Sequence, residues 1–252
     1  MFDKFRQRSY RLENIDIGSY TAEEYEGCIA ELQLVNDWMG DARTLAHTLF
    51  KDLSRNTAAS FSILDVGAGS GHLLRATANW TRSAGKRLWC VGLELNERSA
   101  QAIIEESRGY EEIKSIRGDA LRLPFADRSF DYVISSLFTH HLGDSQIIEV
   151  LREMRRVCAR RIFVIDLNRH PVAYLLYTTV GKLMLHNRLL REDGALSILR
   201  SFKPDELLAL AHAAGLEDIS VTRHFPFRLV LSAAGAPEAP STRGDLGITR
   251  AA

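Results

Sequence analysis

Three glycines follow a short apolar run and form the most informative pattern in this chain. Gly67, Gly69 and Gly71 stand two residues apart directly after the run Phe61–Val66. Glycine tolerates positive φ and lets a ligand approach the backbone, and the start of a following helix offers free N–H groups. The turn is therefore typical of nucleotide binding, although alone it does not tell one nucleotide from another.

The spacing of these glycines narrows the choice of ligand. In the dinucleotide-binding pattern Gly-x-Gly-x-x-Gly, the last glycine would fall on His72. A pyrophosphate needs close access to the start of the helix, and the His72 side chain would obstruct it. The pattern therefore predicts a cofactor that has an adenosine but no pyrophosphate, and it disfavours a nicotinamide oxidoreductase.

Two acidic residues further along the chain fit the rest of an adenosine. Glu94 follows the apolar run Leu88–Leu93, where an acidic side chain can accept hydrogen bonds from both ribose hydroxyls, and Leu95 is then placed to cover an adenine face. Asp119 would accept from the adenine amino group, while the Ala120 N–H would donate to a ring nitrogen. The alternatives are a solvated loop charge at Glu94 and a simple turn cap at Asp119.

Adjacent histidines are the first candidates for acid–base chemistry. His140 and His141 follow the fourth predicted strand, and an imidazole that titrates near neutrality can accept a substrate proton. The alternative is that the pair only holds its loop in place. No metal site is predicted, because adjacent histidines are expected to point apart and no third ligand is evident.

A second polar cluster ends the fifth predicted strand. Asp166, Arg169 and His170 would face the same crevice as the glycines, and Arg169 is a candidate catalytic residue there. These side chains could bind a carboxylate, orient a phenolate or pair with one another. The alternative is an ion pair that fixes the start of the segment that follows.

Apolar runs alternate with amphipathic helical patterns from residue 61 onward, and this rhythm predicts a three-layer α/β domain with parallel strands. The last two strand candidates lie too close together for a helical crossover, so they should pair antiparallel. The fold class expected is a Rossmann-like, doubly wound, seven-stranded and mostly parallel sheet with an antiparallel last strand. The predicted strands are Phe61–Val66, Arg87–Leu93, Glu112–Ile116, Tyr132–Ser136, Ile162–Ile165, Ile219–Arg223 and Phe227–Ser232, and the predicted helices between them cover 72–84, 97–107, 144–158 and 204–214.

Helical additions flank this domain. Residues 1–57 form a predicted helical cap, with a capping box at Thr21 and Glu24 and a second helix over Ala42–Leu53. Residues 58–232 form the main domain. Within it, an apolar insertion at 171–200 is expected to pack as a lid on the core rather than lie on a membrane surface. Residues 233–252 are expected to be disordered.

The composition sets limits on partners. Lysine plus arginine equals aspartate plus glutamate at 32 each among 252 residues, so the overall charge gives no reason to expect nucleic acid as a partner. No stretch is apolar for long enough to suggest a membrane span, and the start of the chain does not look like a secretory signal. A cytoplasmic protein with a small-molecule substrate is expected, and a homodimer is left open.

These motifs together resemble a known family. Asp65–Gly71, Glu94, Gly118–Ala120 and Leu123–Asp131 look like successive motifs of class I S-adenosylmethionine-dependent methyltransferases, over roughly residues 60 to 167. The segment around Leu123–Ser136 is especially similar to the small-molecule branch that includes ubiquinone and menaquinone methyltransferases. The stretches 185–188 and 193–197 resemble methyltransferases of bacterial polyketide pathways.

The resemblance implies S-adenosylmethionine as the cofactor. In that family Asp65 orients the glycine loop and the methionine part of the cofactor, and Ser136 and Leu137 line the approach to the sulfonium. The full set of cofactor-binding residues expected is Asp65, Gly67, Ala68, Gly69, Gly71, Glu94, Leu95, Asp119, Ala120, Ser136 and Leu137.

The resemblance also implies a reaction class. The predicted activity is O- or C-methylation of a small, apolar acceptor that is aromatic, phenolic or polyketide-derived. A methyltransferase acting on a macromolecule is the second hypothesis, and the Asn-Pro-Pro-Tyr type motif common in amino-methylating enzymes is replaced here by Ser135–Phe138. A non-catalytic scaffold that binds the cofactor is the third.

Overall fold

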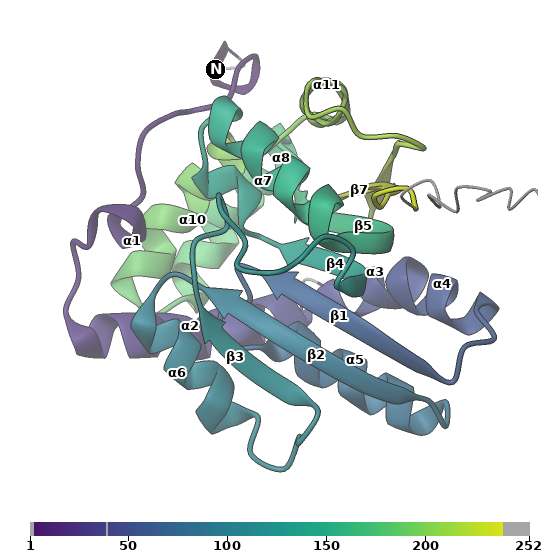
Figure 1. Cartoon of the computed structure of the whole chain (residues 1–252). Coiled ribbons are helices and arrows are strands. Elements are labelled where there is room, and N and C mark those ends of the chain that lie inside the picture. The colour runs from purple at the N-terminus through teal and green to yellow at the C-terminus, as the bar shows by residue number, and fades with distance from the viewer. Residues whose placement is uncertain (1–2, 39, 239–252) are drawn as a thin grey trace, which may run out of the picture.

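Seven strands form one twisted sheet in the order β3-β2-β1-β4-β5-β7-β6 (Figure 1). The structure is a computed structural model, and it describes residues 3–38 and 40–238. The first five strands are parallel, and β7 pairs antiparallel with both β5 and β6. The strands are β1 (Ser60–Val66), β2 (Arg87–Glu94), β3 (Ile113–Arg117), β4 (Phe130–Ser136), β5 (Cys158–Leu167), β6 (Ser220–His224) and β7 (Arg228–Ala234).

The strand order places a crevice where the predicted motifs end. β1 pairs with β2 on one side and with β4 on the other, so the chain switches direction across the sheet at β1. In doubly wound sheets, ligands bind outside the carboxyl ends of the strands at such a switch point. The predicted fold class and the antiparallel pairing of the last two strands are confirmed, and β5 is longer than the predicted Ile162–Ile165.

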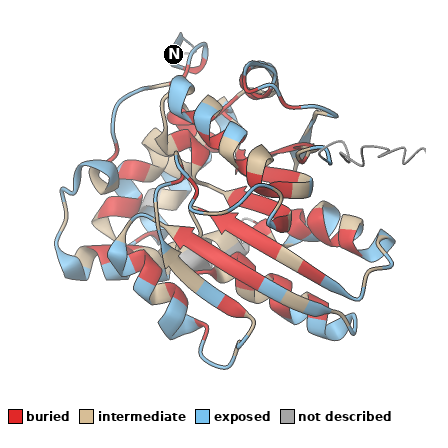
Figure 2. Cartoon of the chain, in the orientation of Figure 1, coloured by how far each residue is buried: buried red, intermediate tan, exposed pale blue. Residues whose placement is uncertain are grey.

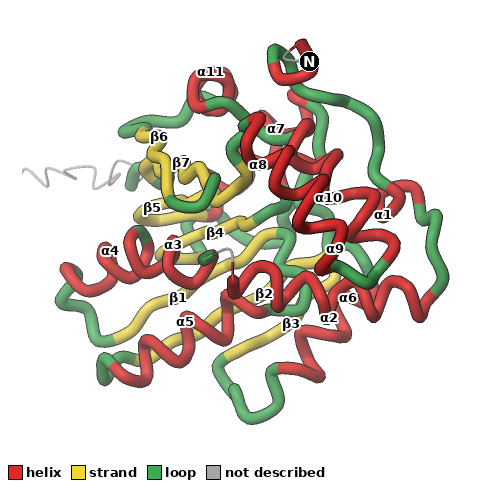
Figure 3. The backbone as a smooth tube through the Cα atoms, turned by 180° about the vertical axis from the view of Figure 1, so that it is seen from behind, coloured by secondary structure: helices red, strands yellow, loops and turns green. Residues whose placement is uncertain are grey.

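Helices cover both faces of the sheet, as Figures 1 and 3 show. One face carries α3 (Asp41–His47), α4 (Leu49–Arg55), α5 (His72–Ser83) and α6 (Glu97–Glu106); the other carries α7 (Asp144–Val157) and α11 (Pro204–Ala213). Apolar side chains of the central strands are buried against both layers (Figure 2). This burial holds the strand ends, and the polar residues that follow them, in fixed positions.

A further group of helices packs together at the carboxyl end of the sheet (Figure 3). Cys28 of α2 packs with Leu185, Leu189 and Leu190 of the insertion in a small apolar cluster of its own. The predicted capping box at the start of α2 is present, because Glu24 and Thr21 each accept the other's backbone N–H. The group comprises η1 (Asp3–Phe5), α1 (Asn14–Ile17), α2 (Ala22–Trp38), α8 (Pro171–Leu176), the π-helical turn η3 (Tyr177–Gly181), α9 (Lys182–Met184) and α10 (Arg188–Arg200).

Two predicted boundaries are wrong. The single helix predicted over Ala42–Leu53 is broken at Thr48, whose hydroxyl donates to the Thr44 carbonyl and so competes with the helical backbone. The predicted disordered tail begins too early, because Ala233 and Ala234 belong to β7 and pair with β5. Residues 239–252 of that predicted tail lie outside the described part of the chain.

The insertion is only half packed onto the core. Its inner face supplies Ala173, Leu189 and Ile198, whereas a large part of its apolar surface faces outward. The prediction of a core-packed lid is therefore corrected, because the short helices α8 and α9 present only one face to the rest of the protein. None of the described helices is long and apolar enough to span a membrane. The exposed apolar side chains are Val172, Leu175, Leu176, Val180, Leu183 and Met184.

A buried ion pair ties the N-terminal helices to the last strand. Asp41 begins α3 and Arg228 begins β7, and the Arg228 Nε donates to the Asp41 carboxylate at 2.6 Å. Each side chain is only 2% exposed. Removing one partner of such a pair leaves the other charge buried without compensation.

We therefore expect Asp41→Ala to lower the free energy of unfolding by about 3–5 kcal/mol. Urea denaturation measures this loss. The matched control is Glu26→Ala, which removes a solvent-exposed ion pair with Arg98 and should change the stability by less than about 1 kcal/mol. Equal effects of the two substitutions would contradict the role assigned to the buried pair.

Candidate active site

The glycine turn has the backbone geometry that its spacing predicts. Gly67, Gly69 and Gly71 adopt φ of 72°, 58° and 80°, a left-handed region that disfavours other residues. A side chain at Gly67 would place its Cβ 2.5 Å from the ring of Phe138, which follows β4. The turn therefore needs glycine both for its conformation and for its close contact with the loop after β4.

Glu94 lies across the glycine turn at the end of β2. The Gly69 N–H donates to its Oε1 at 2.6 Å, so the carboxylate and the turn are in direct contact. Burial raises the pKa of Glu94 to about 7, although the Gly69 N–H and the charge of His141 act in the opposite direction. The side chain is thus a partly desolvated acceptor beside the turn, as a ribose-binding residue must be.

Asp65, at the carboxyl end of β1, is buried and incompletely paired. Its Oδ1 makes no hydrogen bond, and burial, with Glu94 nearby, raises the pKa of Asp65 to about 8. The buried Ser136 Oγ at the end of β4 also lacks a partner. Orphaned buried polar atoms are rare unless a ligand completes them. The unpaired oxygens therefore fit a polar ligand such as the methionine end of the predicted cofactor.

The adenine end of the predicted site is more open. Leu95 is 65% exposed and lines a groove of about 1010 Å³ between α2 and the start of α6. Asp119 is exposed, and its Oδ1 accepts the Leu121 N–H at 2.9 Å, which is the turn cap named as the alternative. Among the described residues, no hydrogen bond to its second carboxylate oxygen is found, so the cap leaves an acceptor available. Ala120 is buried directly beside it.

His140 is held inside the protein by Asp166. Its Nδ1 lies 2.7 Å from the Asp166 Oδ1, and the other carboxylate oxygen accepts from the Thr139 hydroxyl and from the His140 backbone N–H. Although burial opposes ionisation, these partners lower the pKa of Asp166 to about 2. The His140 side chain is 4% exposed, so its contacts are those of a residue that fixes the loop after β4.

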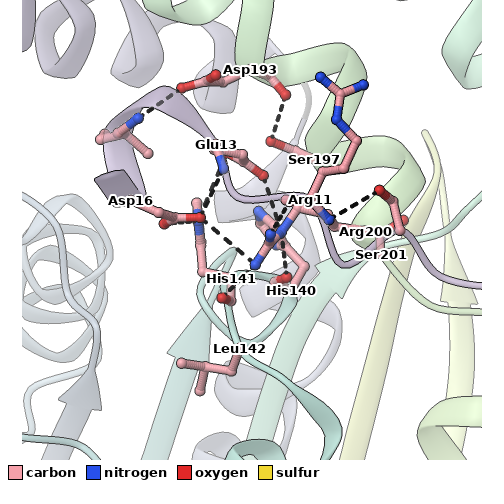
Figure 4. Close-up of polar contacts among 12 residues, drawn as sticks. Arg11, Glu13, Asp16, His140, His141, Leu142, Asp193, Ser197, Arg200 and Ser201 are labelled. Carbon is pink, nitrogen blue, oxygen red and sulfur yellow. Dashed lines mark hydrogen bonds and ion pairs between the residues drawn. The ribbon is translucent and has the colours of Figure 1, made fainter. Parts of the chain in front are cut away.

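His141 has an equivalent partner but more access to solvent (Figure 4). Its Nδ1 lies 2.8 Å from the Asp16 Oδ1, and its side chain is 24% exposed. The two imidazole rings lie with their centroids 4.3 Å apart and their planes tilted by 33°, which corrects the expectation that adjacent histidines point apart. They lie together because the loop after β4 forms one 3-10 turn, η2 (Thr139–His141).

Glu13 joins the two histidines and could complete a metal-ligand set. One ligand atom from each of Glu13, His140 and His141 lies within 4.8 Å of the other two. The guanidinium of Arg200 already lies 3.6 Å from Glu13 and 3.7 Å from Asp16, however, and supplies a buried positive charge to both carboxylates. Because a cation of the protein already neutralises this cluster, we do not assign a metal to it.

Arg169 faces away from the crevice. Its guanidinium donates to the Glu206 carboxylate and to the backbone carbonyls of Phe5, Arg6 and Ser201. The predicted role of Arg169 in binding the acceptor is therefore wrong, and the alternative of an ion pair that fixes the insertion is the one found. The physical reason is that a guanidinium so deeply buried must satisfy its N–H groups within the protein.

Sequence reasoning missed the residues that the N-terminal segment brings to the site. Glu13 and Asp16 precede the first strand by more than forty positions, and Arg200 ends the insertion. The Asp193 carboxylate of α10 accepts the backbone N–H groups of Asn14 and Ile15, which docks α1 on the insertion. No sequence motif predicted these contacts, because each joins elements that are far apart in the sequence.

Comparisons with known proteins concern the domain that carries these residues. Residues 63–161 match the family described as a methyltransferase domain. The chain is 26% identical over 228 residues to (RS)-norcoclaurine 6-O-methyltransferase of Thalictrum flavum subsp. glaucum, covering 86% of this chain and 57% of that protein. It is 30% identical over 133 residues to demethylmenaquinone methyltransferase of Staphylococcus epidermidis, covering 44% of this chain and 54% of that protein.

The chain thus spans little more than half the length of these relatives. Human N-acetylserotonin methyltransferase in complex with SAM shares the fold, with a TM-score of 0.60 and 18% identity, over 93% of this chain and 65% of that one. The predicted resemblance to S-adenosylmethionine-dependent methyltransferases is confirmed. Residues 63–161 are a methyltransferase domain.

We expect Glu94→Gln to weaken binding of S-adenosylhomocysteine, because a neutral amide replaces a charged acceptor for ribose hydroxyls. A charged hydrogen bond contributes about 1.5–3 kcal/mol, which corresponds to a roughly 10- to 150-fold increase in Kd. Isothermal titration calorimetry measures it. The control is Glu217→Gln, at an exposed ion pair with Arg155 away from this groove, which should leave Kd unchanged. Unchanged affinity in Glu94→Gln would remove this residue from the site.

The raised pKa values of Asp65 and Glu94, about 8 and 7, predict a pH dependence of stability. In the absence of ligand the folded protein keeps protons on these carboxyls that the unfolded chain releases near pH 4. Between about pH 4.5 and pH 8 the folded state therefore binds more protons, and their contribution to the free energy of unfolding falls as pH rises.

Asp65→Asn removes the larger of the two shifts. We expect the urea midpoint of this variant to fall less than that of the unmodified protein between about pH 5 and pH 8, so that the variant gains relative stability at the upper end. Affinity for S-adenosylhomocysteine should fall at the same time. Parallel pH profiles for the two proteins would show that Asp65 is ionised in the folded state throughout this range.

Proposed function

We propose that this chain, whose residues 63–161 are a methyltransferase domain, transfers a methyl group from S-adenosylmethionine to a hydroxyl of a small aromatic acceptor. The observation that carries the proposal is the position of an accessible, carboxylate-bound imidazole, His141, on the loop after β4, beside the glycine turn and Glu94. An imidazole at this position would be a proton acceptor next to the site proposed for the cofactor.

The residues around the glycine turn would hold the cofactor. Glu94 would accept from the ribose hydroxyls, Asp65 and Ser136 would face the methionine part, and Leu95 with Asp119 would bound the adenine. Bound there, S-adenosylmethionine supplies a methyl group already activated by a sulfonium. What the protein must add is alignment of the acceptor and exclusion of water.

His141 would take up the proton of the acceptor hydroxyl. A carboxylate can only accept hydrogen bonds, so the proton between Asp16 and His141 lies on Nδ1, and Nε2 of the neutral ring carries a lone pair. Within the described part of the chain, no other hydrogen bond of this ring is found. The proton would leave the acceptor oxygen for Nε2 as that oxygen forms its bond to the methyl carbon, while the bond from this carbon to the sulfonium sulfur breaks and S-adenosylhomocysteine is the leaving group.

Two features support a small aromatic acceptor. One relative, a norcoclaurine 6-O-methyltransferase, aligns over 86% of this chain, and the N-acetylserotonin methyltransferase structure aligns over 93% of it. The α1–α2 and α8–α10 segments also cover the carboxyl end of the sheet, which disfavours access by a macromolecule.

The proposal predicts turnover with phenolic acceptors. We expect isotopically labelled methyl from S-adenosylmethionine to appear in the product when the protein is incubated with a panel of catechols and naphthohydroquinones. Mass spectrometry identifies the methylated product, and carbon NMR distinguishes an O-methyl from a C-methyl group. A protein that binds S-adenosylhomocysteine but methylates no member of the panel or of a metabolite extract would instead be a scaffold.

His141→Gln should lower kcat by about 10²–10⁴-fold, because general base catalysis contributes that much. Its Kd for S-adenosylhomocysteine should stay within about threefold of the unmodified value, since His141 is proposed to face the acceptor. The control is His186→Gln, at a histidine that is 93% exposed on the insertion, which should leave kcat unchanged. Full activity in His141→Gln would remove the base from the mechanism.

A further inference from the structure

We infer that Asp16, a residue of the N-terminal segment, is the positioning residue that sets the tautomer and orientation of the His141 base, so that docking of this segment completes the active site. The inference rests on the proposed function of His141. It assigns a role to a part of the chain that lies outside the matched methyltransferase domain, residues 63–161.

Both oxygens of the Asp16 carboxylate are engaged. Oδ1 lies 2.8 Å from the His141 Nδ1, and Oδ2 accepts the Glu13 backbone N–H at 3.2 Å. The Arg200 guanidinium adds a positive charge 3.7 Å away. Although burial acts in the opposite direction, the hydrogen bond from His141 is among the contacts that lower the pKa of Asp16. The carboxylate is therefore ionised and held in a single orientation.

An ionised carboxylate at Nδ1 has a defined consequence for the ring. It accepts the Nδ1 proton and so keeps Nε2 unprotonated in the neutral imidazole, ready to receive a proton. When the proton of the acceptor hydroxyl moves to Nε2, the Nδ1 proton remains on the ring, and Asp16 stabilises the imidazolium. This division of labour between an orienting carboxylate and a histidine base recurs in unrelated enzymes.

The segment that carries Asp16 is held by contacts made only when it is docked. The Arg200 guanidinium binds the carbonyls of Arg11, His140 and His141, so one side chain fixes the segment and the histidine loop together (Figure 4). Asp193 holds the start of α1 from the same helix. The distance between Asp16 and His141 is thus controlled by the insertion.

The two histidines differ in the origin of their carboxylate partners. His140 has its own carboxylate partner, Asp166, supplied by the sheet itself, and it is shielded from solvent. His141, the more exposed ring, depends on a carboxylate that arrives from outside the sheet. The tautomer of His140 should therefore be independent of the N-terminal segment, whereas that of His141 should depend on it.

Long-range proton–nitrogen NMR of the histidine rings tests the inference without any acceptor. We expect His141 in the whole protein, at a pH where the ring is neutral, to be the Nδ1–H tautomer, with His141→Gln providing the assignment. In Asp16→Asn the amide can donate to Nδ1, so the signal should change to the Nε2–H tautomer. A control substitution in the same segment, Asp3→Asn at an exposed carboxylate, should leave the spectrum unchanged.

Kinetics supply the second readout. With a phenolic acceptor, Asp16→Asn should lower kcat by at least about tenfold while KM changes by less than about threefold, because orientation of the base matters in the transition state. Asp16→Glu, which retains a carboxylate, should recover the Nδ1–H tautomer and part of the rate. These outcomes exclude a role confined to folding.

Two results would overturn the inference. One is an Nε2–H tautomer of His141 in the unmodified protein. The other is an Nδ1–H tautomer that persists in Asp16→Asn together with an unchanged kcat. Failure of the proposed function is separately visible, because it would show as absent binding of S-adenosylhomocysteine in calorimetry or as absent methyl transfer to every acceptor of the panel, whatever the tautomer of His141.

Discussion

The buried guanidinium of Arg200 constrains how the site can be assembled. Moving a charged group out of water is costly unless hydrogen bonds and opposite charges replace the water, and this side chain is 3% exposed. Its partners come from the N-terminal segment and from the loop after β4, while Arg200 itself ends α10. The three elements must therefore dock together, since the loss of any one of them would leave the buried guanidinium without some of its partners. The partners are the carbonyls of Arg11, His140 and His141 and the carboxylates of Glu13 and Asp16.

This constraint divides the site into two halves of different origin. The cofactor half is made by the sheet, because Asp65, the glycine turn and Glu94 all follow the first two strands and meet at the switch point. The acceptor half combines one strand-end loop with elements added around the domain. The matched methyltransferase domain ends at residue 161, so it contains the cofactor half and His141 but neither Asp16 nor Arg200. Of the proposed acceptor half, Asp16 and Arg200 therefore lie in the part of the chain that the domain match does not cover.

The same division explains what the sequence predicted and what it did not. The strands, the glycine turn and the position of Glu94 were predictable because their signals are local. These signals are the period of the apolar residues, the spacing of the glycines and the place of an acidic residue after a strand. The partner of His141 was not, because Asp16 lies 125 residues away and no pattern links the two. Arg169 was assigned wrongly for a related reason. Its place just after β5 predicted a side chain that faces the crevice. Its guanidinium instead donates hydrogen bonds within the protein, to the carbonyls of Phe5, Arg6 and Ser201 and to the Glu206 carboxylate.

Two largely buried carboxyls, Asp65 and Glu94, leave the proposed cofactor half incompletely satisfied. Burial raises the pKa of Asp65 and of Glu94, so ionising either in the folded protein costs free energy that the unfolded chain does not spend. A ligand that donates hydrogen bonds to these oxygens recovers part of that cost, which adds to its affinity. The His141–Asp16 pair is the opposite case, since it is satisfied within the protein and oriented before any acceptor binds. In the proposed function, incompletely satisfied carboxyls that bind the cofactor would therefore lie beside a preorganised pair that takes up the proton of the acceptor.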